Sequence, residues 1–461
     1  MKNVKFSLIA ASLALALGNS FATAATLQAV VADTLQSNPE VLITTNDRLA
    51  VEQELKGAHG GYLPTLDLNL GYGVEESNNP TTRATGSDNI DLNRGEAEII
   101  ARQMLFDGFA TSNEVDRQQS RVNSRAYTVA GTANETALRT AEVYVQYLRR
   151  KELVDLAKLN LDAHEKTFQQ IKLRSERGVD RKADLDQTQG RLALAKSNLM
   201  AEESNLREAE VNYVAVVGVS PENLERPVPA FDQLPKNLPD AIKQAQDQHP
   251  TLKSAGADIN AAHAQYMASR SLNLPRVHLE LSATEENNLD GIRGTNEDAQ
   301  AMLRMRYNLF NGSKDLARKR ETANLINEAK EIRNRTCRQV VESMRLSWNN
   351  YETVNRQMDY FKQHLESSER ARDAYQKQFS IGQRTLLDLL DSENELFEAR
   401  SAYTNGVYDK IFAAYRILAS KGQIVSSLGL KDPTEAAQSD YVAGDVSPDT
   451  DYKTWTAKPV N

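Results

Sequence analysis

The tetrapeptide Leu105-Phe106-Asp107-Gly108 recurs, with one change, as Leu309-Phe310-Asn311-Gly312. The two copies are 204 residues apart, because 309 − 105 = 204. Gly178 and Gly382, each followed six residues later by Asp-Leu, keep the same spacing. Two matches at one spacing are difficult to obtain by chance, and the spacing is far longer than a solenoid repeat. It therefore predicts a duplicated unit of domain size.

The two halves differ in length near their amino-terminal ends. Asn38-Pro39 corresponds to His249-Pro250, and Leu63-Pro64 to Leu274-Pro275, at a spacing of 211 residues (250 − 39 = 211). Seven residues (211 − 204 = 7) are therefore inserted in the first half between Pro64 and Leu105. We expect a first repeat at 25–220, a proline-rich linker at 221–239 and a second repeat at 240–430.

The first 24 residues have the layout of a cleavable secretory signal. Lys2 and Lys5 precede an apolar run at 6–17, and Ala22-Thr23-Ala24 precedes the expected cleavage site. A membrane anchor is the alternative, but the run is shorter than the roughly 20 residues of a spanning helix. The single cysteine, Cys337, allows no internal disulfide and no lipid-bearing cysteine at the expected mature terminus.

Proline is absent between Pro80 and Pro221 and between Pro275 and Pro433. Because proline breaks helix interiors, both stretches are free to form very long helices. Apolar residues recur there at three- and four-residue spacing. A helix over 108–177 would be about 105 Å long, so it needs coiled-coil neighbours along its apolar stripe. The two repeat glycines would end these rods, which predicts two long antiparallel helical hairpins.

Between its short first helix and its long one, each half changes to a two-residue alternation. The alternating segments are 66–74, 97–105 (less regular), 277–283 and 300–309. We expect four strands of about ten residues, in β-hairpins at 64–106 and 275–310. Such strands are long enough to cross a bilayer, although the half-buried strands of a soluble sandwich would look the same. Four strands cannot close a transmembrane barrel, whereas three copies give twelve.

This order of features resembles the TolC family of bacterial outer-membrane channels. The resemblance extends to about residue 430 and rests on the duplication, Asn38-Pro39, Tyr62-Leu63-Pro64, the repeated tetrapeptide and the glycine-centred tips. It implies a mainly α fold with a membrane β-barrel, in which a homotrimer builds the barrel and a periplasmic tunnel of coiled-coil helices. It also implies a periplasmic adaptor (membrane fusion protein), an inner-membrane ABC transporter or other pump, and outer-membrane lipid as partners.

The resemblance also assigns a periplasmic gate to the second hairpin tip. It implies that Asp388 and Asp391 form carboxylate rings at the constriction and that Asp184 and Arg384 pair as a latch. Phe379 stands where a tyrosine supplies a further latch in the best-known members. Side chains three apart share a helix face, and clustered carboxylates attract cations, including a blocking divalent cation. Solvated carboxylates near a turn, and an exposed ion pair contributing under about 1 kcal/mol, are the alternative.

Two more groups of residues are candidates for function. The candidate adaptor-docking residues at the tips are Gly178, Val179, Ile381 and Gly382. Helix capping alone also explains both glycines. Arg102 and Arg306 are 204 residues apart (306 − 102 = 204) and are candidates for a basic ring in the barrel lumen. An ordinary polar barrel interior would look the same.

The sequence contains no catalytic, cofactor-binding or metal-binding motif. Asn311-Gly312-Ser313-Lys314 lacks the spacing of a P-loop, and the six histidines show no ligand spacing. The net charge of −8 argues against nucleic acid as a partner. We therefore expect neither an enzyme nor a cofactor.

The sequence favours an outer-membrane exit duct for type I protein secretion, carrying an adhesin or toxin. Drug or metal efflux through the same kind of channel is the alternative. A soluble periplasmic coiled-coil adaptor or structural rod is a further alternative, although an adaptor would have one helical hairpin rather than two. The tail at 431–461, rich in Asp, Ser, Thr and Pro, is expected to be disordered.

Overall fold

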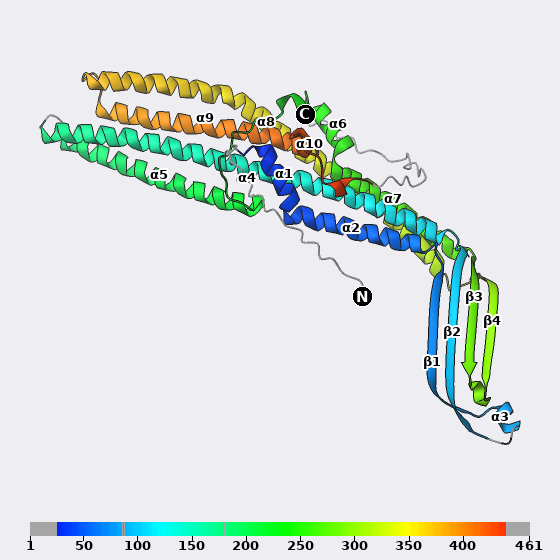
Figure 1. Ribbon diagram of the computed structural model, residues 1–461. Helices are drawn as coiled ribbons and strands as arrows, with labels where there is room; N and C mark the ends of the chain where they lie inside the picture. The colour runs from blue at the N-terminus through cyan, green and yellow to red at the C-terminus, as the bar shows by residue number, and fades with distance from the viewer. Residues whose placement is uncertain (1–24, 85, 87, 179–180, 439–461) are drawn as a thin grey trace, which may run out of the picture.

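The computed structural model describes residues 25–84, 86, 88–178 and 181–438. An elongated bundle of helices leads at one end into a four-stranded sheet (Figure 1). The expected leader at 1–24, Val179 and residues 439–461 of the expected tail lie outside the described residues. Residues 431–438 are described and include a short 3-10 turn, Thr434–Ala436, that lies against α4.

The first half runs from α1 to α5. Its elements are α1 (Leu27–Ser37), α2 (Pro39–Gly60), β1 (Thr65–Ser77), α3 (Pro80–Ala84), β2 (Ile90–Phe106), α4 (Ala110–Glu176) and α5 (Lys182–Val217). The helix α4 has 67 residues and α5 has 36. They form the first long helical hairpin, which confirms the predicted one.

The second half repeats this plan. Its elements are α6 (Leu238–Gln248), α7 (Pro250–Arg270), β3 (Arg276–Asn287), β4 (Thr295–Arg306), α8 (Lys314–Ser380), α9 (Leu386–Ser420) and α10 (Ile424–Ser427), with 3-10 turns at Phe231–Gln233, Ser271–Asn273 and Leu289–Gly291. The helix α8 again has 67 residues and α9 has 35, so the internal duplication is confirmed. None of the described helices is both long and apolar enough to cross a membrane.

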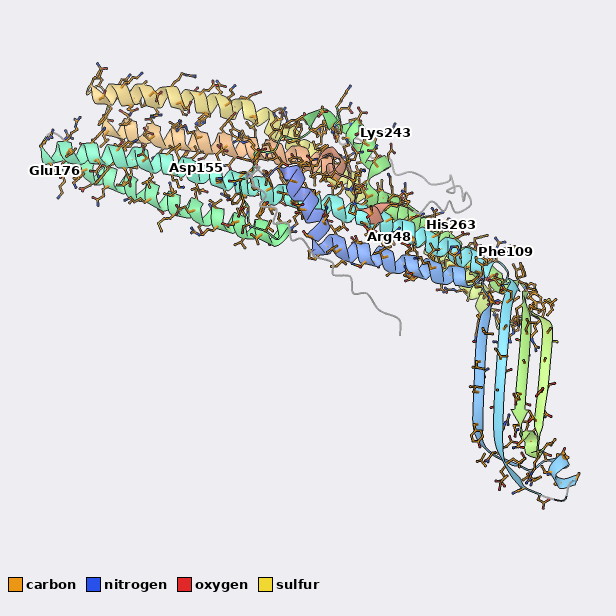
Figure 2. The ribbon with its side chains drawn as sticks, in the orientation of Figure 1. Arg48, Phe109, Asp155, Glu176, Lys243 and His263 are labelled. Atoms are coloured by element: carbon orange, nitrogen blue, oxygen red, sulfur yellow. The ribbon has the colours of Figure 1, made fainter. Side chains whose placement is uncertain are left out.

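The repeated sequence motifs mark the starts of equivalent helices. Asn38 and His249 cap α2 and α7, and in each case the side chain accepts a hydrogen bond from a backbone N–H and a proline follows. The repeated tetrapeptide ends in a glycine at φ 73° or 71°, where the chain turns from strand into α4 or α8. Glycine adopts this left-handed conformation without steric cost. Phe109, labelled in Figure 2, lies at this junction.

The four strands pair antiparallel in the order β1-β2-β3-β4, which confirms the two predicted β-hairpins and adds the pairing of β2 with β3. They contain 13, 17, 12 and 12 residues and are therefore longer than the expected ten. The register shifts between Met104 and Phe106, and this bulge explains why the alternation near the end of β2 is less regular. The fourth strand ends at Arg306, although the alternation continues to residue 309.

The two faces of the sheet differ in chemistry. Leu66, Leu68 and Leu70 of β1 share the apolar face with Leu281 of β3 and Leu303 of β4. These leucines are between 47% and 72% exposed, so no layer formed by the described residues covers them. The polar face carries the remaining alternate residues, most of them charged or amide side chains. A sandwich would have buried the apolar face, so one chain does not form the soluble alternative.

The main core lies in the middle of the helical bundle. Tyr144 of α4 and Tyr415 of α9 are almost completely buried there, together with apolar residues of α1 and α10. The Tyr144 hydroxyl lies 2.7 Å from the carbonyl oxygens of both Ala25 and Glu225, and can donate to either. Ala25 and the linker segment around Glu225 are thereby fixed to α4. Away from this core, the long helices bury fewer side chains, and the partner helix of the same hairpin provides much of their packing.

Gly422, which follows α9, is expected to be the glycine least tolerant of a side chain. Its φ is +74°, and a Cβ there would lie 2.3 Å from Pro250 Cδ and 3.2 Å from His249 Cα. Gly312 is a matched control, because its φ is +71° and no atom lies within 4 Å of its Cβ position. We expect Gly422→Ala to destabilise the protein by about 1–3 kcal/mol more than Gly312→Ala, through the added clash. Thermal unfolding in detergent, followed by circular dichroism, measures this, and equal melting temperatures would contradict it.

Candidate functional site

The tips of both helical hairpins lie at the end of the bundle farthest from the sheet (Figure 1). Glu176, labelled in Figure 2, marks the first of them. Gly178 and Gly382 both have φ +74° and donate their backbone N–H to the preceding turn, to Ser175 and Phe379 respectively. Both glycines therefore cap helices, as the alternative interpretation holds. Ile381 beside Gly382 is 68% exposed, which leaves an apolar side chain free for a partner.

A small apolar cluster joins the two hairpins next to these tips, on the side toward the sheet. Ile171 of α4, with Leu386 and Leu390 of α9, forms its buried centre. Leu185 of α5 and Phe379 of α8 pack against this centre, so all four long helices contribute. The Phe379 ring also lies 5.8 Å from the guanidinium carbon of Arg174. Phe379 thus makes apolar and ring contacts between the hairpins, whereas its role as a latch stays a prediction.

Asp388 is part of the amino-terminal cap of α9. The Thr385 hydroxyl accepts a hydrogen bond from the Asp388 backbone N–H, and the Asp388 carboxylate accepts one from the Thr385 backbone N–H, which together make a capping box. The carboxylate also accepts a 2.8 Å hydrogen bond from the Thr385 hydroxyl. Hydrogen bonds from Thr385, followed by the charge of Arg384, lower the pKa of Asp388. The carboxylate is therefore held ionised at the tip.

Arg384 contacts its own hairpin. Its guanidinium lies 4.3 Å from the centre of the Tyr375 ring, 3.0 Å from the Gln378 side-chain oxygen and 3.8 Å from the Asp388 carboxylate. Across the described part of one chain, Arg384 forms its ion pair with Asp388 and not with Asp184. Asp184 lies in the first turn of α5. A latch between Asp184 and Arg384 would therefore have to join different copies of the chain.

Asp391 has a partner that the sequence did not reveal. Its Oδ1 accepts a 2.7 Å charge-assisted hydrogen bond from Nη2 of Arg191 on α5. This ion pair joins the second hairpin to the first. The two residues are 200 positions apart, and no short-range spacing rule connects them. The duplication does not point to Arg191 either, because the equivalent position in the second half, 204 residues later, is Glu395 and not an arginine.

On the polar face of the sheet, arginines lie mainly at the end near the helices and carboxylates mainly toward the other end. Near the helices, Arg102 of β2 forms ion pairs with Asp67 and Glu280, and Glu280 also pairs with Arg304. Arg306 lies opposite Arg276 in the register, which leaves this end of the face basic. Carboxylates predominate toward the far end, at Glu96, Glu98, Glu286 and Asp298. Of the two arginines predicted for the lumen, Arg102 is thus neutralised within one chain.

A groove of about 710 Å³ lies between α4 and the second hairpin, above the tips. Its apolar lining includes Leu173, Phe379 and Leu396, and Arg174 and Arg372 add positive charge. No group of acidic, histidine or cysteine side chains among the described residues has the arrangement of a metal site.

Comparison with known proteins identifies the family. A sequence profile described as "Outer membrane efflux protein" matches residues 30–219 and 241–422. The chain belongs to this family. The two matched segments are the two halves of the duplication, and they are separated by the proline-rich segment.

Curated relatives match most of the chain at low identity. Outer membrane efflux protein BepC of Brucella suis is 25% identical over 78% of both chains. Outer membrane protein TolC of Escherichia coli K12 is 22% identical over 88% of this chain and 84% of its own. Alkaline protease secretion protein AprF of Pseudomonas aeruginosa is 22% identical over 83% of this chain and 81% of its own. The resemblance to the TolC family is therefore confirmed.

Solved structures confirm the fold. The Campylobacter jejuni CmeC outer membrane channel has a TM-score of 0.76 at 14% identity, over 89% of this chain and 87% of its own. The open state of the Neisseria gonorrhoeae MtrE outer membrane channel has a TM-score of 0.73 at 14% identity, over 86% of this chain and 89% of its own. The chain is thus an exit channel of the Gram-negative outer membrane with a periplasmic helical tunnel. Its homologues are channel proteins rather than enzymes.

We expect Thr385→Ala to loosen the start of α9 at the candidate gate. The substitution removes the capping hydroxyl, which contributes about 1 kcal/mol to a helix start. Amide hydrogen exchange over 386–390 should become about fivefold faster, whereas Thr385→Ser should stay close to the wild type because it keeps the hydroxyl. Unchanged exchange in the alanine variant would show that the capping box contributes nothing there.

Proposed function

We propose that three copies of this chain form a continuous duct across the outer membrane and the periplasm. The observation that carries this proposal is the sheet, which has one exposed apolar face. Its two edges, β1 and β4, have no strand partner in the part of the chain that the structure describes. Unpaired backbone groups cannot remain in lipid, so the edges must pair with other copies. Three four-stranded sheets supply the twelve strands of a closed barrel, with the apolar face toward lipid and the polar face toward the lumen.

The helices would continue the duct below the barrel. A helix of 67 residues is about 100 Å long, and each copy contributes two such helices and their shorter partners. Exposed apolar residues of α5, such as Leu194, Met200 and Val211, have no cover within one chain. Packing against a second copy would cover them, as a closed bundle requires. The homotrimer is therefore part of the proposal.

The narrow end of the duct is proposed to be the hairpin tips, with Asp388 and Asp391 as the gate residues. Six carboxylates around a threefold axis would favour cations and give a divalent cation a place to block the pore. The contacts in one chain refine this hypothesis, because Arg384 accompanies Asp388 and Arg191 holds Asp391. Asp388 and Asp391 would attract cations most strongly after these arginines move away.

The partners are proposed to be a periplasmic adaptor and an inner-membrane pump, in keeping with the tripartite systems of the family. We propose that the adaptor docks at the tips around Gly178, Val179, Ile381 and Gly382. The exposed Ile381 and the adjoining groove offer apolar contact area for such a partner.

The cargo is proposed to be a protein exported by a type I system. The match to the alkaline protease secretion protein, which extends over 83% of this chain, supports this proposal. Small-molecule efflux is the second candidate, and the higher identity to the efflux protein BepC favours it. The third alternative, a soluble periplasmic rod or adaptor, is excluded because the chain belongs to a family of outer-membrane efflux proteins.

We expect Asp388→Ala combined with Asp391→Ala to reduce cation selectivity and abolish divalent-cation block in planar lipid bilayers. The reason is that both carboxylates leave the constriction. Asp359→Ala, which removes an exposed carboxylate of α8 well above the tips, is the control and should behave like the wild type. If the double variant keeps both properties, the two aspartates do not line the gate.

Deleting the gene in its host would separate the two kinds of cargo. For type I secretion, one or more large proteins should disappear from the medium while susceptibility to drugs and metals stays the same, because no small-molecule pump loses its exit. Complementation with the intact chain is the control. Increased susceptibility with an unchanged set of secreted proteins would favour efflux instead.

A further inference from the structure

Four side chains from three helices lie close together next to the proposed gate residue Asp391. We call them the His164 cluster: His164 of α4, Arg191 of α5, and Asp391 and Asn394 of α9. Asp391 and Asn394 are three residues apart, so they lie on one side of α9. Through Asp391 this side of α9 binds α5, and through Asn394 it binds α4. The His164 cluster therefore joins the second hairpin to both helices of the first.

His164 is the buried member of the cluster. Its side chain is only 3% exposed and is hydrogen bonded to the side chain of Asn394. Its other ring nitrogen, Nδ1, is buried and has no hydrogen-bond partner among the described residues. A neutral imidazole fits this position, because one nitrogen donates and the other can remain a lone pair. A protonated imidazole would bury an N–H without an acceptor.

Among the charged groups near His164, Arg191 opposes its protonation, and the others are in ion pairs. On α5, Arg191 places its positive charge near the ring, and Lys196 is engaged with Glu165 at 3.9 Å. On α4 itself, Lys166 pairs with Asp162. On α9, Asp391 is held by Arg191. The other acidic residues of this part of α9 interact with α8, Glu393 with Arg372 at 3.7 Å and Glu395 with His364 at 3.0 Å.

The pKa of His164 agrees with this arrangement. Burial first, and then the charge of Arg191, lower it below the ordinary value of 6.5, although the hydrogen bond with Asn394 acts in the opposite direction. A lowered pKa means that the joined arrangement is fully stable above about pH 6.5. Its stability is lost progressively as the pH falls below that value, because the separated arrangement takes up the proton more readily.

We propose that the His164 cluster is an acid-sensitive tie that holds the two hairpins of each chain together and releases them when the periplasm is acidified. The proposal rests on the proposed gate at the tips. In the proposed gate, cargo passes when the tips separate. The contacts between the hairpins at this level include the apolar cluster around Ile171 and the His164 cluster. Separation lets water reach the imidazolium and frees Arg191 from Asp391. Acid thereby favours the open channel and uncovers the Asp391 carboxylate.

The test is single-channel conductance of the full-length protein in a planar bilayer at about pH 7.5 and about pH 5. Because the pKa of His164 is lowered in the closed arrangement, the open-to-closed ratio should rise on acidification, by at most about 30-fold per chain when the open arrangement has the ordinary pKa of about 6.5. His164→Gln keeps a donor for Asn394 and does not titrate, so this variant should lose the acid response. His364→Gln, an exposed histidine of α8, is the matched control and should keep it. An acid response that persists in His164→Gln, or is missing in the wild type, overturns the proposal.

A second variant keeps the test decisive if His164→Gln does not assemble. Arg191→Gln breaks the ion pair at a partly exposed position and should raise the conductance already at neutral pH. Arg191→Lys keeps a positive charge beside Asp391 and leaves the gate carboxylates unchanged, so it is the matched control and should keep the low neutral-pH conductance. If Arg191→Lys and Arg191→Gln both conduct like the wild type, the ion pair is not the tie.

These outcomes are distinct from failure of the proposed gate itself. The gate hypothesis predicts the loss of divalent-cation block when Asp388 and Asp391 are both replaced. His164→Gln should retain that block, since it leaves both carboxylates in place. A channel that shows the block but no dependence on His164 would overturn the tie and leave the gate intact.

Discussion

The fold depends on backbone hydrogen bonds that a single chain cannot complete. The strands β1 and β4 each have an edge without a partner, and the apolar face between them is exposed. In lipid each unsatisfied backbone group is costly, so the sheet is stable there only as part of a closed barrel. In the proposed trimer, this requirement would place the long helices around a common axis. The proposed gate would then lie where the helices meet again at their far ends.

The two halves of the duplication also depend on contacts with each other. One β-hairpin followed by one helical hairpin is half of the structure. The two halves meet between β2 and β3, and between α4 of the first half and α7 and α9 of the second. The halves are not equivalent at the tips. The second carries Asp388, Arg384 and Asp391, whereas the first supplies Arg191 and His164. The candidate gate is therefore built from the differences between two similar units.

Most of the fold could be predicted from the sequence, because its signals are local and repeated. The two-residue alternation located all four strands, and the absence of proline together with the repeat glycines located both long hairpins. The strand lengths could not be predicted, because β2 continues as polar residues that the hydrophobic pattern does not mark. The side-chain contacts at the hairpin tips could not be predicted from the sequence either. Arg191 and His164 lie on helices far from Asp391 in the sequence, and only the packing of the hairpins brings them together.

The equal lengths of α4 and α8, 67 residues each, have a consequence for evolution. If an insertion of four residues occurred in only one of them, its tip would move along the axis by about one helical turn, roughly 6 Å. The apolar cluster that joins the tips would then lose its register. Changes in tunnel length must therefore occur in both halves together, for instance by matched insertions after the gene duplication.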